Sequence, residues 1–229
     1  MRLTVRHVYD FGSDRALVGD DLVRPEAWDA LRTQTSGPFS MPADRASWEQ
    51  SALERPDIMG RGEAAADWLS HQRIDSVASY GVGGGSFEFA LIRAKPEMTL
   101  QITEYAPSTV ARLRAIFPEA APQQHDMLKD APLDAELHVF HRIDTEFSNR
   151  EWGKVFAAFR QQRILFIASE LLTLRTGAHE ILYRMRNSSV TKAGWRRNPA
   201  AFEALWRRTH SGRRIPIGDL AAWDLRPKD

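Results

Sequence analysis

The chain has 229 residues, 43% hydrophobic and 27% charged, which is enough apolar material for one globular domain with a full core. It contains no cysteine, which excludes disulfides and a cysteine nucleophile and is typical of a protein in the reducing cytoplasm. No apolar run approaches membrane-spanning length and the first ten residues contain no signal-peptide core, so we expect a cytoplasmic protein without a membrane partner.

The amino-terminal part of the chain, residues 1–55, has a mixed composition. It is rich in Asp, Arg, Ser and Pro, with Trp28 and Trp48 as isolated aromatic anchors. We interpret it as a cap on the substrate side of a domain that spans residues 56–229. That domain is predicted to begin with a helix within 56–72, where apolar residues recur at helical spacing.

Strands and helices are then predicted to alternate along the chain. The apolar run of one strand is followed each time by a helical stripe, which indicates βαβ units. We therefore expect an α/β fold with a Rossmann-like, mostly parallel sheet flanked by helices. The predicted strands are 74–80, 98–103, 137–143 and 164–169, and the predicted helices are 86–94, one beginning at Pro107 and one containing Trp152 and Phe156.

Two parts of this fold are weakly signalled by the residues. A strand near 121–126 is inferred from the topology more than from its composition. After the last core strand, a helical insertion is predicted at about 175–210. The tail 213–225 is expected to add one or two final strands.

The stretch "SVASYGVGGGSFEFALIRAK", residues 76–95, has Gly81, Gly83, Gly84 and Gly85 between a predicted strand and a predicted helix. Small residues at this junction let a ligand approach the backbone, and a helix amino terminus offers free N–H groups. The carboxyl end of a strand is also where open α/β sheets bind ligands. We therefore expect a nucleotide-type ligand at these glycines.

The spacing of the glycines separates three classes of nucleotide site. A phosphate-binding loop needs Lys and Ser or Thr after its last glycine, and here Ser86 and Phe87 follow Gly85. The dinucleotide pattern G-x-G-x-x-G needs glycine where Ser86 stands, which disfavours a nicotinamide dehydrogenase. The pattern G-x-G-x-G fits Gly81, Gly83 and Gly85, and it resembles that of the class I S-adenosylmethionine-dependent methyltransferases.

This resemblance extends along the chain and implies that the cofactor is S-adenosylmethionine. In that family an acid at the end of the second strand holds the ribose, and Glu104 is there, followed by Tyr105 at the adenine face. Asp126 matches the residue that receives the adenine amino group, with Met127 beside it. The cofactor contacts implied by the resemblance are Ser79, Tyr80, Gly81, Gly83, Gly85, Glu104, Tyr105, Asp126, Met127 and His141.

One position departs from the family pattern. The family usually has an acid two residues before the first glycine, where this chain has Ser79. A serine can still accept a hydrogen bond, but it carries no charge. This leaves open weaker cofactor binding, another carboxylate that substitutes, or a non-catalytic binding protein that retains the fold.

The catalytic candidates lie in "FHRIDTEFSNREW", residues 140–152, which the resemblance places beside the reacting methyl group. His141 could act as the base, and Asp144 or Glu146 could orient an amine or a hydroxyl. The alternative is that His141 packs inside the sheet and the acids cap the next helix. No histidine spacing indicates a metal site, so none is expected.

The function favoured by these features is methyl transfer from S-adenosylmethionine to an oxygen or nitrogen of a small molecule. A second candidate is an RNA or polyanion methyltransferase, because residues 160–229 contain 14 basic and 6 acidic residues, a net charge of +8. Its aromatic residues have core-like spacing, so we interpret this basic part mainly as a solvated helical face.

Overall fold

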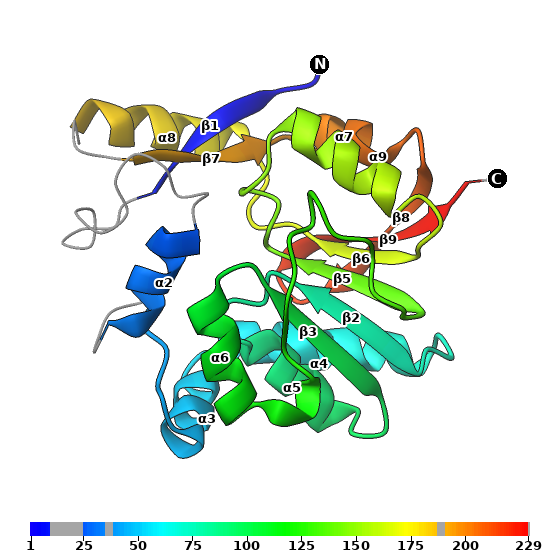
Figure 1. The fold of residues 1–229 in the computed structure, drawn as a ribbon. Coiled ribbons are helices and arrows are strands. Elements are labelled where there is room, and N and C mark those ends of the chain that lie inside the picture. The colour runs from blue at the N-terminus through cyan, green and yellow to red at the C-terminus, as the bar shows by residue number, and fades with distance from the viewer. Residues whose placement is uncertain (10–24, 35–38, 187–190, 229) are drawn as a thin grey trace.

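The computed structural model describes residues 1–9, 25–34, 39–186 and 191–228. A seven-stranded sheet forms its centre, with five parallel strands and two final strands that form an antiparallel hairpin (Figure 1). In spatial order the strands are β4 (Gln123–Gln124), β3 (Thr99–Glu104), β2 (Ser76–Tyr80), β5 (Leu137–His141), β6 (Ile164–Ile167), β9 (Leu220–Pro227) and β8 (His210–Ile217).

Both faces of the central strands β2, β5 and β6 are buried, which is why these strands are largely apolar. Neighbouring residues of β5 belong to different cores, since Val139 packs in one hydrophobic cluster and Phe140 in the other. The first cluster is completed by α3 (Arg45–Leu53), α4 (Pro56–Ser70), α5 (Ser86–Ala94) and α6 (Pro107–Ile116), and the second by α7 (Asn149–Ala158) and α9 (Pro199–Trp206).

The predicted Rossmann-like α/β fold is confirmed, and local chemistry explains several of its boundaries. α5 begins after Gly85, which adopts a φ of 74° that favours glycine. α7 begins with a capping box in which Ser148 and Glu151 exchange hydrogen bonds with each other's backbone. The weakly signalled strand near 121–126 is reduced to the two residues of β4, after the short helix η2 (Pro118–Ala120).

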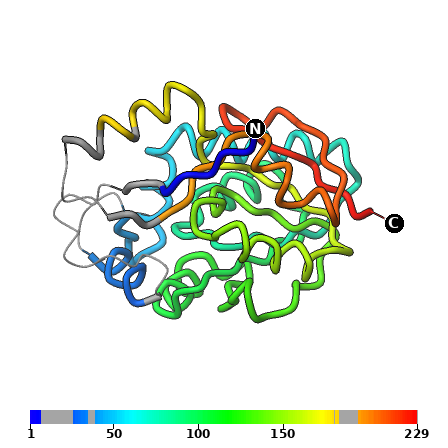
Figure 2. Tube along the Cα trace, turned by 90° about the horizontal axis from the view of Figure 1, so that it is seen from above, coloured from blue at the N-terminus to red at the C-terminus, as the bar shows by residue number. Residues whose placement is uncertain are grey.

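The start of the chain pairs with a late segment in a ribbon that was not predicted. β1 (Thr4–Tyr9) pairs antiparallel with β7 (Thr191–Arg197), and the two lie side by side in Figures 1 and 2. The predicted helical insertion at about 175–210 therefore contains a strand between α8 (Leu174–Arg186) and α9. The division of the chain at residue 55 stays a prediction, although Trp48 of α3 packs in the core of the main domain.

The amino-terminal segment also supplies α2 (Pro25–Thr33), which lies next to α6. Its position brings residues from the start of the chain to the carboxyl edge of the parallel strands (Figure 1). Across the described ranges, the helices fall short of the length and apolarity required to cross a bilayer.

Candidate active site

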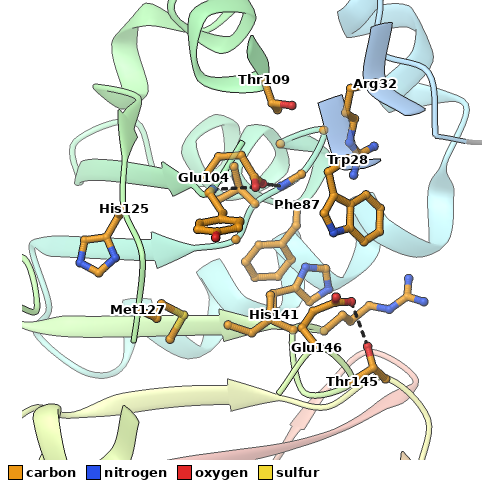
Figure 3. Close-up of a pocket in the computed structure, with 18 of the residues that line it drawn as sticks. Trp28, Arg32, Phe87, Glu104, Thr109, His125, Met127, His141, Thr145 and Glu146 are labelled. Atoms are coloured by element: carbon orange, nitrogen blue, oxygen red, sulfur yellow. Dashed lines mark hydrogen bonds between the residues drawn. The ribbon is translucent and has the colours of Figure 1, made fainter. Parts of the chain in front are cut away.

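A cavity of about 550 Å³ lies where the turns after β2, β3 and β5 meet (Figure 3). This is the edge at which open α/β sheets bind ligands. Three of the residues proposed from the sequence, Ser79, Tyr80 and Asp144, do not line it. Those that do line it are Gly81, Gly83, Gly85, Glu104, Tyr105, Asp126, Met127, His141 and Glu146.

The glycine turn, residues 81–85, needs glycine for two physical reasons. Gly81, Gly83 and Gly85 all have positive φ angles, between 57° and 74°, which strain other residues. A Cβ at Gly83 would also lie 2.5 Å from Nη2 of Arg32, and one at Gly81 would lie 2.7 Å from Cγ2 of Ile143. The turn therefore lines the cavity with backbone atoms and without side chains at its glycines.

Glu104 ends β3 with its carboxylate held against this turn. Its Oε2 accepts from the backbone N–H of Gly83 at 2.7 Å, and its Oε1 accepts from that of Tyr105 at 2.7 Å. Two backbone donors thus fix the orientation of the carboxylate on the cavity wall. The remaining lone pairs of such a carboxylate can accept from two vicinal hydroxyls.

Asp126 and Met127 form another part of the wall, after β4. Asp126 Oδ1 accepts from the backbone N–H of Leu128 at 3.0 Å, and its Oδ2 pairs with Lys129 Nζ at 2.8 Å. These bonds hold the carboxylate in one orientation beside the buried side chain of Met127. The pair can offer one acceptor and one apolar surface to a flat heteroaromatic ring.

The serine in the place of the family acid has a buried partner. Ser79 Oγ donates to Glu88 Oε1 at 2.7 Å, and burial raises the pKa of Glu88 to about 7. A carboxyl of α5 therefore lies beside the β2 position at which the family usually has an acid. Neither Ser79 nor Glu88 lines the cavity. Tyr80 is likewise buried, with its hydroxyl 3.0 Å from His138 Nδ1 and accepting from the backbone N–H of Leu133.

His141 lies at the end of β5 and on the cavity wall. Its ring stacks on Phe87 with the centroids 4.2 Å apart, and its buried Nε2 bonds to no described residue. Burial lowers the pKa of His141 to about 3, and the charges on Arg142 and Arg61 act in the same direction. The imidazole is therefore neutral at pH 7, and the same low pKa makes it a weak base.

Glu146 lies near His141 in the same wall (Figure 3). Burial raises the pKa of Glu146 to about 8, and the charges on Asp144 and Glu104 act in the same direction. Thr145 Oγ1 donates to its Oε1 at 3.3 Å. A carboxyl that is largely protonated at pH 7 can donate a hydrogen bond as well as accept one.

Asp144 is buried behind the wall. Its Oδ1 accepts from the backbone N–H of Ser169 at 2.7 Å and from the Ser169 hydroxyl at 2.8 Å. Burial raises the pKa of this carboxyl, whereas the bonds from Ser169 and the charge on Arg197 oppose the shift. Asp144 therefore joins the turn after β5 to the turn after β6, which differs from the role at the substrate proposed from the sequence.

Several wall residues were not identified from the sequence because they come from the amino-terminal segment. Trp28, seen only as an isolated aromatic, and Arg32 both project from α2 into the cavity (Figure 3). Phe39, Arg55 and Ile58 add to the same side. Within the described part of the chain, no three His, Asp or Glu side chains gather as a metal-binding group.

Comparison with known proteins gives matches among solved structures. No family model and no curated protein sequence matches the chain. Human N-acetylserotonin methyltransferase, in complex with S-adenosylmethionine, superposes with a TM-score of 0.61 at 18% identity over 80% of this chain and 56% of that one. Mitomycin 7-O-methyltransferase MmcR gives 0.61 at 14% identity over 95% and 76%.

An O-methyltransferase family protein from Burkholderia thailandensis gives a TM-score of 0.58 at 14% identity, covering 98% of this chain and 65% of that one. The chain thus spans between about half and three quarters of the length of these structures. At such identities the likeness concerns the fold. The strand order, the glycine turn and these superpositions together identify the fold of this chain as that of the class I S-adenosylmethionine-dependent methyltransferases.

Proposed function

We propose that the chain transfers a methyl group from S-adenosylmethionine to a hydroxyl oxygen of a small molecule. The observation that carries this proposal is that one cavity joins the glycine turn, Glu104 and Asp126 to His141 and Glu146. The glycine turn, Glu104 and Asp126 could hold a nucleoside. His141 and Glu146 could accept or donate a proton. The similar structures include O-methyltransferases, which supports oxygen over nitrogen as the acceptor.

The cofactor residues fit the proposed ligand in their chemistry. The backbone at Gly84 leaves room for close approach, since a Cβ there would have only Arg32 Nη1 within 4 Å, at 3.9 Å. The fixed carboxylate of Glu104 suits the ribose hydroxyls. Asp126 suits the adenine amino group, with Tyr105 and Met127 as apolar neighbours of the base.

The chemistry that the cofactor supplies is a methyl group already activated on a sulfonium. The residues of the chain then have to orient the hydroxyl, exclude water and accept its proton. His141 is the proposed proton acceptor, and because its low pKa makes it a weak base, this role requires an acidic hydroxyl. Glu146 is the proposed hydrogen-bond partner of the acceptor oxygen. Phe87, stacked on His141, limits the rotation of the imidazole.

The rest of the cavity favours a flat, partly apolar substrate. Trp28, Phe39, Ile58 and Phe147 contribute large apolar surfaces to its wall. An aromatic compound with a phenolic hydroxyl would match these surfaces and would release its proton more readily than an alkyl alcohol. One structure similar to this chain is an O-methyltransferase family 2 protein in complex with apigenin, with a TM-score of 0.53.

Calorimetry tests the cofactor part of the proposal. We expect S-adenosylmethionine and S-adenosylhomocysteine to bind in the micromolar range and NADH not to compete. Glu104→Ala should weaken binding by about 2 kcal/mol or more, because it removes charge-assisted hydrogen bonds. Asp126→Ala should cost less. Bound NADH with no S-adenosylhomocysteine binding would refute the proposal.

Turnover tests the catalytic part. A panel of phenols and aromatic amines is incubated with S-adenosylmethionine, and S-adenosylhomocysteine is measured. We expect methylation of a phenol, and a fall of about 100-fold or more in kcat for His141→Asn with cofactor affinity retained. Methylation of amines alone would assign a nitrogen acceptor. Cofactor binding with no turnover on any acceptor would favour a non-catalytic binding protein.

A further inference from the structure

The guanidinium of Arg32 lies against the glycine turn, and no role has been assigned to it so far. Its Nη2 is 2.5 Å from where a Cβ on Gly83 would be, and its Nη1 is 3.9 Å from the equivalent point on Gly84. The guanidinium comes from α2, far from the turn in sequence, and faces the cavity (Figure 3). A cation from the amino-terminal segment therefore stands directly over the bare backbone.

Neighbouring groups hold this guanidinium in place, but only some of its N–H donors make hydrogen bonds. Its Nη1 donates to the backbone oxygen of Phe39 at 3.1 Å, and its Cζ lies 5.7 Å from the ring centroid of Trp28. The backbone oxygen of Arg32 accepts from Arg112 Nη1 at 2.9 Å and from the N–H of Met41 at 3.1 Å, which anchors the end of α2. Nε and Nη2 make no hydrogen bond to a described residue, so donors remain for a ligand.

Two carboxyls, those of Glu104 and Glu146, act on the charge of Arg32, but neither forms an ion pair with it within 4 Å in the described part of the chain. Burial lowers the pKa of Arg32 from 12.5, with Glu104 and Glu146 opposing the shift and Arg55 adding to it, and an arginine remains protonated in such a site. Glu104 is already engaged by the N–H groups of Gly83 and Tyr105. A half-buried guanidinium with free donors is stabilised by a carboxylate, whose geometry matches its own.

We propose that Arg32 binds the carboxylate of the amino-acid part of S-adenosylmethionine above the glycine turn. The inference rests on the proposed function and adds a residue that the amino-terminal segment contributes to cofactor recognition. It also bears on Ser79: since neither Ser79 nor its partner Glu88 lines the cavity, the methionine end would be recognised through its carboxylate. Helix α2 would thus contribute Arg32 to the cofactor and Trp28 to the substrate side of the cavity.

A comparison of two ligands by calorimetry tests this proposal without any turnover. One is S-adenosylhomocysteine, and the other is its decarboxylated form, S-adenosyl-3-thiopropylamine, which lacks only the carboxylate. We expect the parent protein to bind the decarboxylated ligand about 10- to 100-fold more weakly, the range for a lost charge-assisted bond. Arg32→Met should bind S-adenosylhomocysteine more weakly by the same factor and should leave the affinity for the decarboxylated ligand unchanged.

Two further variants separate the contact from a structural effect. Arg32→Lys keeps the charge and should recover part of the affinity. Arg93→Met, an exposed arginine of α5 outside the cavity, should bind both ligands as the parent does. An equal loss of both ligands in Arg32→Met would mean that Arg32 only supports the fold, and the inference would fail.

The remaining outcomes are also distinct. Unchanged S-adenosylhomocysteine affinity in Arg32→Met, with weaker binding of a hydroxybenzoate probe, would assign Arg32 to a substrate carboxylate and overturn the inference alone. No binding of S-adenosylhomocysteine by the parent protein would overturn the proposed function and the inference together.

Discussion

At the scale of single residues, the surroundings of a side chain decide what it does, and the buried pair of Glu88 and Ser79 is an example. Glu88 is 1% exposed and accepts a hydrogen bond from Ser79, so a buried carboxyl of α5 is paired with a hydroxyl of β2. Neither side chain lines the cavity. Burying this ionisable carboxyl lowers the stability of the fold by an amount that depends on pH.

The stability of the protein should report the titration of Glu88. Its pKa is near 4.5 in the unfolded chain and about 7 in the folded protein, so the folded state binds more protons between these values. This contribution to stability is therefore lost as the pH rises through that window. In urea denaturation, Glu88→Gln should reduce the loss of unfolding free energy between pH 5 and pH 8 by about 2 to 3 kcal/mol.

The same loss in the parent and in Glu88→Gln would show that this carboxyl is not responsible. Ser79→Ala provides a control, since it removes the hydrogen bond but leaves the buried carboxyl.

Two glycines allow a matched test of the glycine turn. Gly83 has a φ of 57° and faces Arg32, whereas Gly153 lies within α7 with nothing within 4 Å of an added Cβ. Gly83→Ala should lower cofactor affinity at least about tenfold, because the strained backbone and the displaced Arg32 both disturb the site. Gly153→Ala should leave affinity unchanged and stabilise the fold by up to about 1 kcal/mol. Retained affinity in Gly83→Ala would contradict this account of the turn.

At the scale of elements, the ribbon of β1 and β7 supports the turn that carries the catalytic candidates. Arg197, at the end of β7, is fully buried. It donates to Asn149 Oδ1 at 2.7 Å, to the backbone oxygen of Asp144 at 2.6 Å and to that of Phe147. One of the arginines that makes the carboxyl-terminal part basic is therefore a structural bridge and not a solvated charge.

Removing this bridge should unfold the turn after β5 before the rest of the molecule. Arg197→Met leaves two carbonyl oxygens without their charged donor, so we expect a loss of about 3 kcal/mol or more in unfolding free energy. Turnover should fall because Glu146 lies in this turn. Arg208→Met, on an exposed position after α9, is the control and should change stability by less than about 0.5 kcal/mol. Equal effects of the two variants would refute the bridging role.

At the scale of the whole molecule, the basic excess after residue 160 is divided among several contacts. Arg196 pairs with Glu170 at 3.2 Å, and Arg214 lies over the Trp223 ring at 5.9 Å. Arg163 pairs with the buried Asp224 at 2.9 Å. These contacts distribute the charge over separate elements, which argues against one continuous track for a phosphate backbone.

Filter binding with a random RNA pool tests the polyanion alternative. We expect weak binding that is largely lost at about 150 mM salt, because few phosphates would be neutralised at once. The Arg207→Ala/Arg208→Ala double variant should not change this result. Submicromolar binding that persists at that salt concentration, and that weakens in the double variant, would make nucleic acid the better substrate class.

The amino-acid sequence by itself determined the parallel sheet and several of the residues that line the cavity. Strand and helix periods are local, and the glycines, Glu104 and Asp126 each follow directly from a strand end, so chain order places them at one edge.

The tertiary structure alone decided what comes from distant segments. Arg32 over Gly83, Glu88 beneath Ser79 and the pairing of β1 with β7 join residues that no local pattern connects. Whether a side chain reaches the cavity or the core depends on such packing, which is why Asp144 lies behind the wall that Glu146 forms.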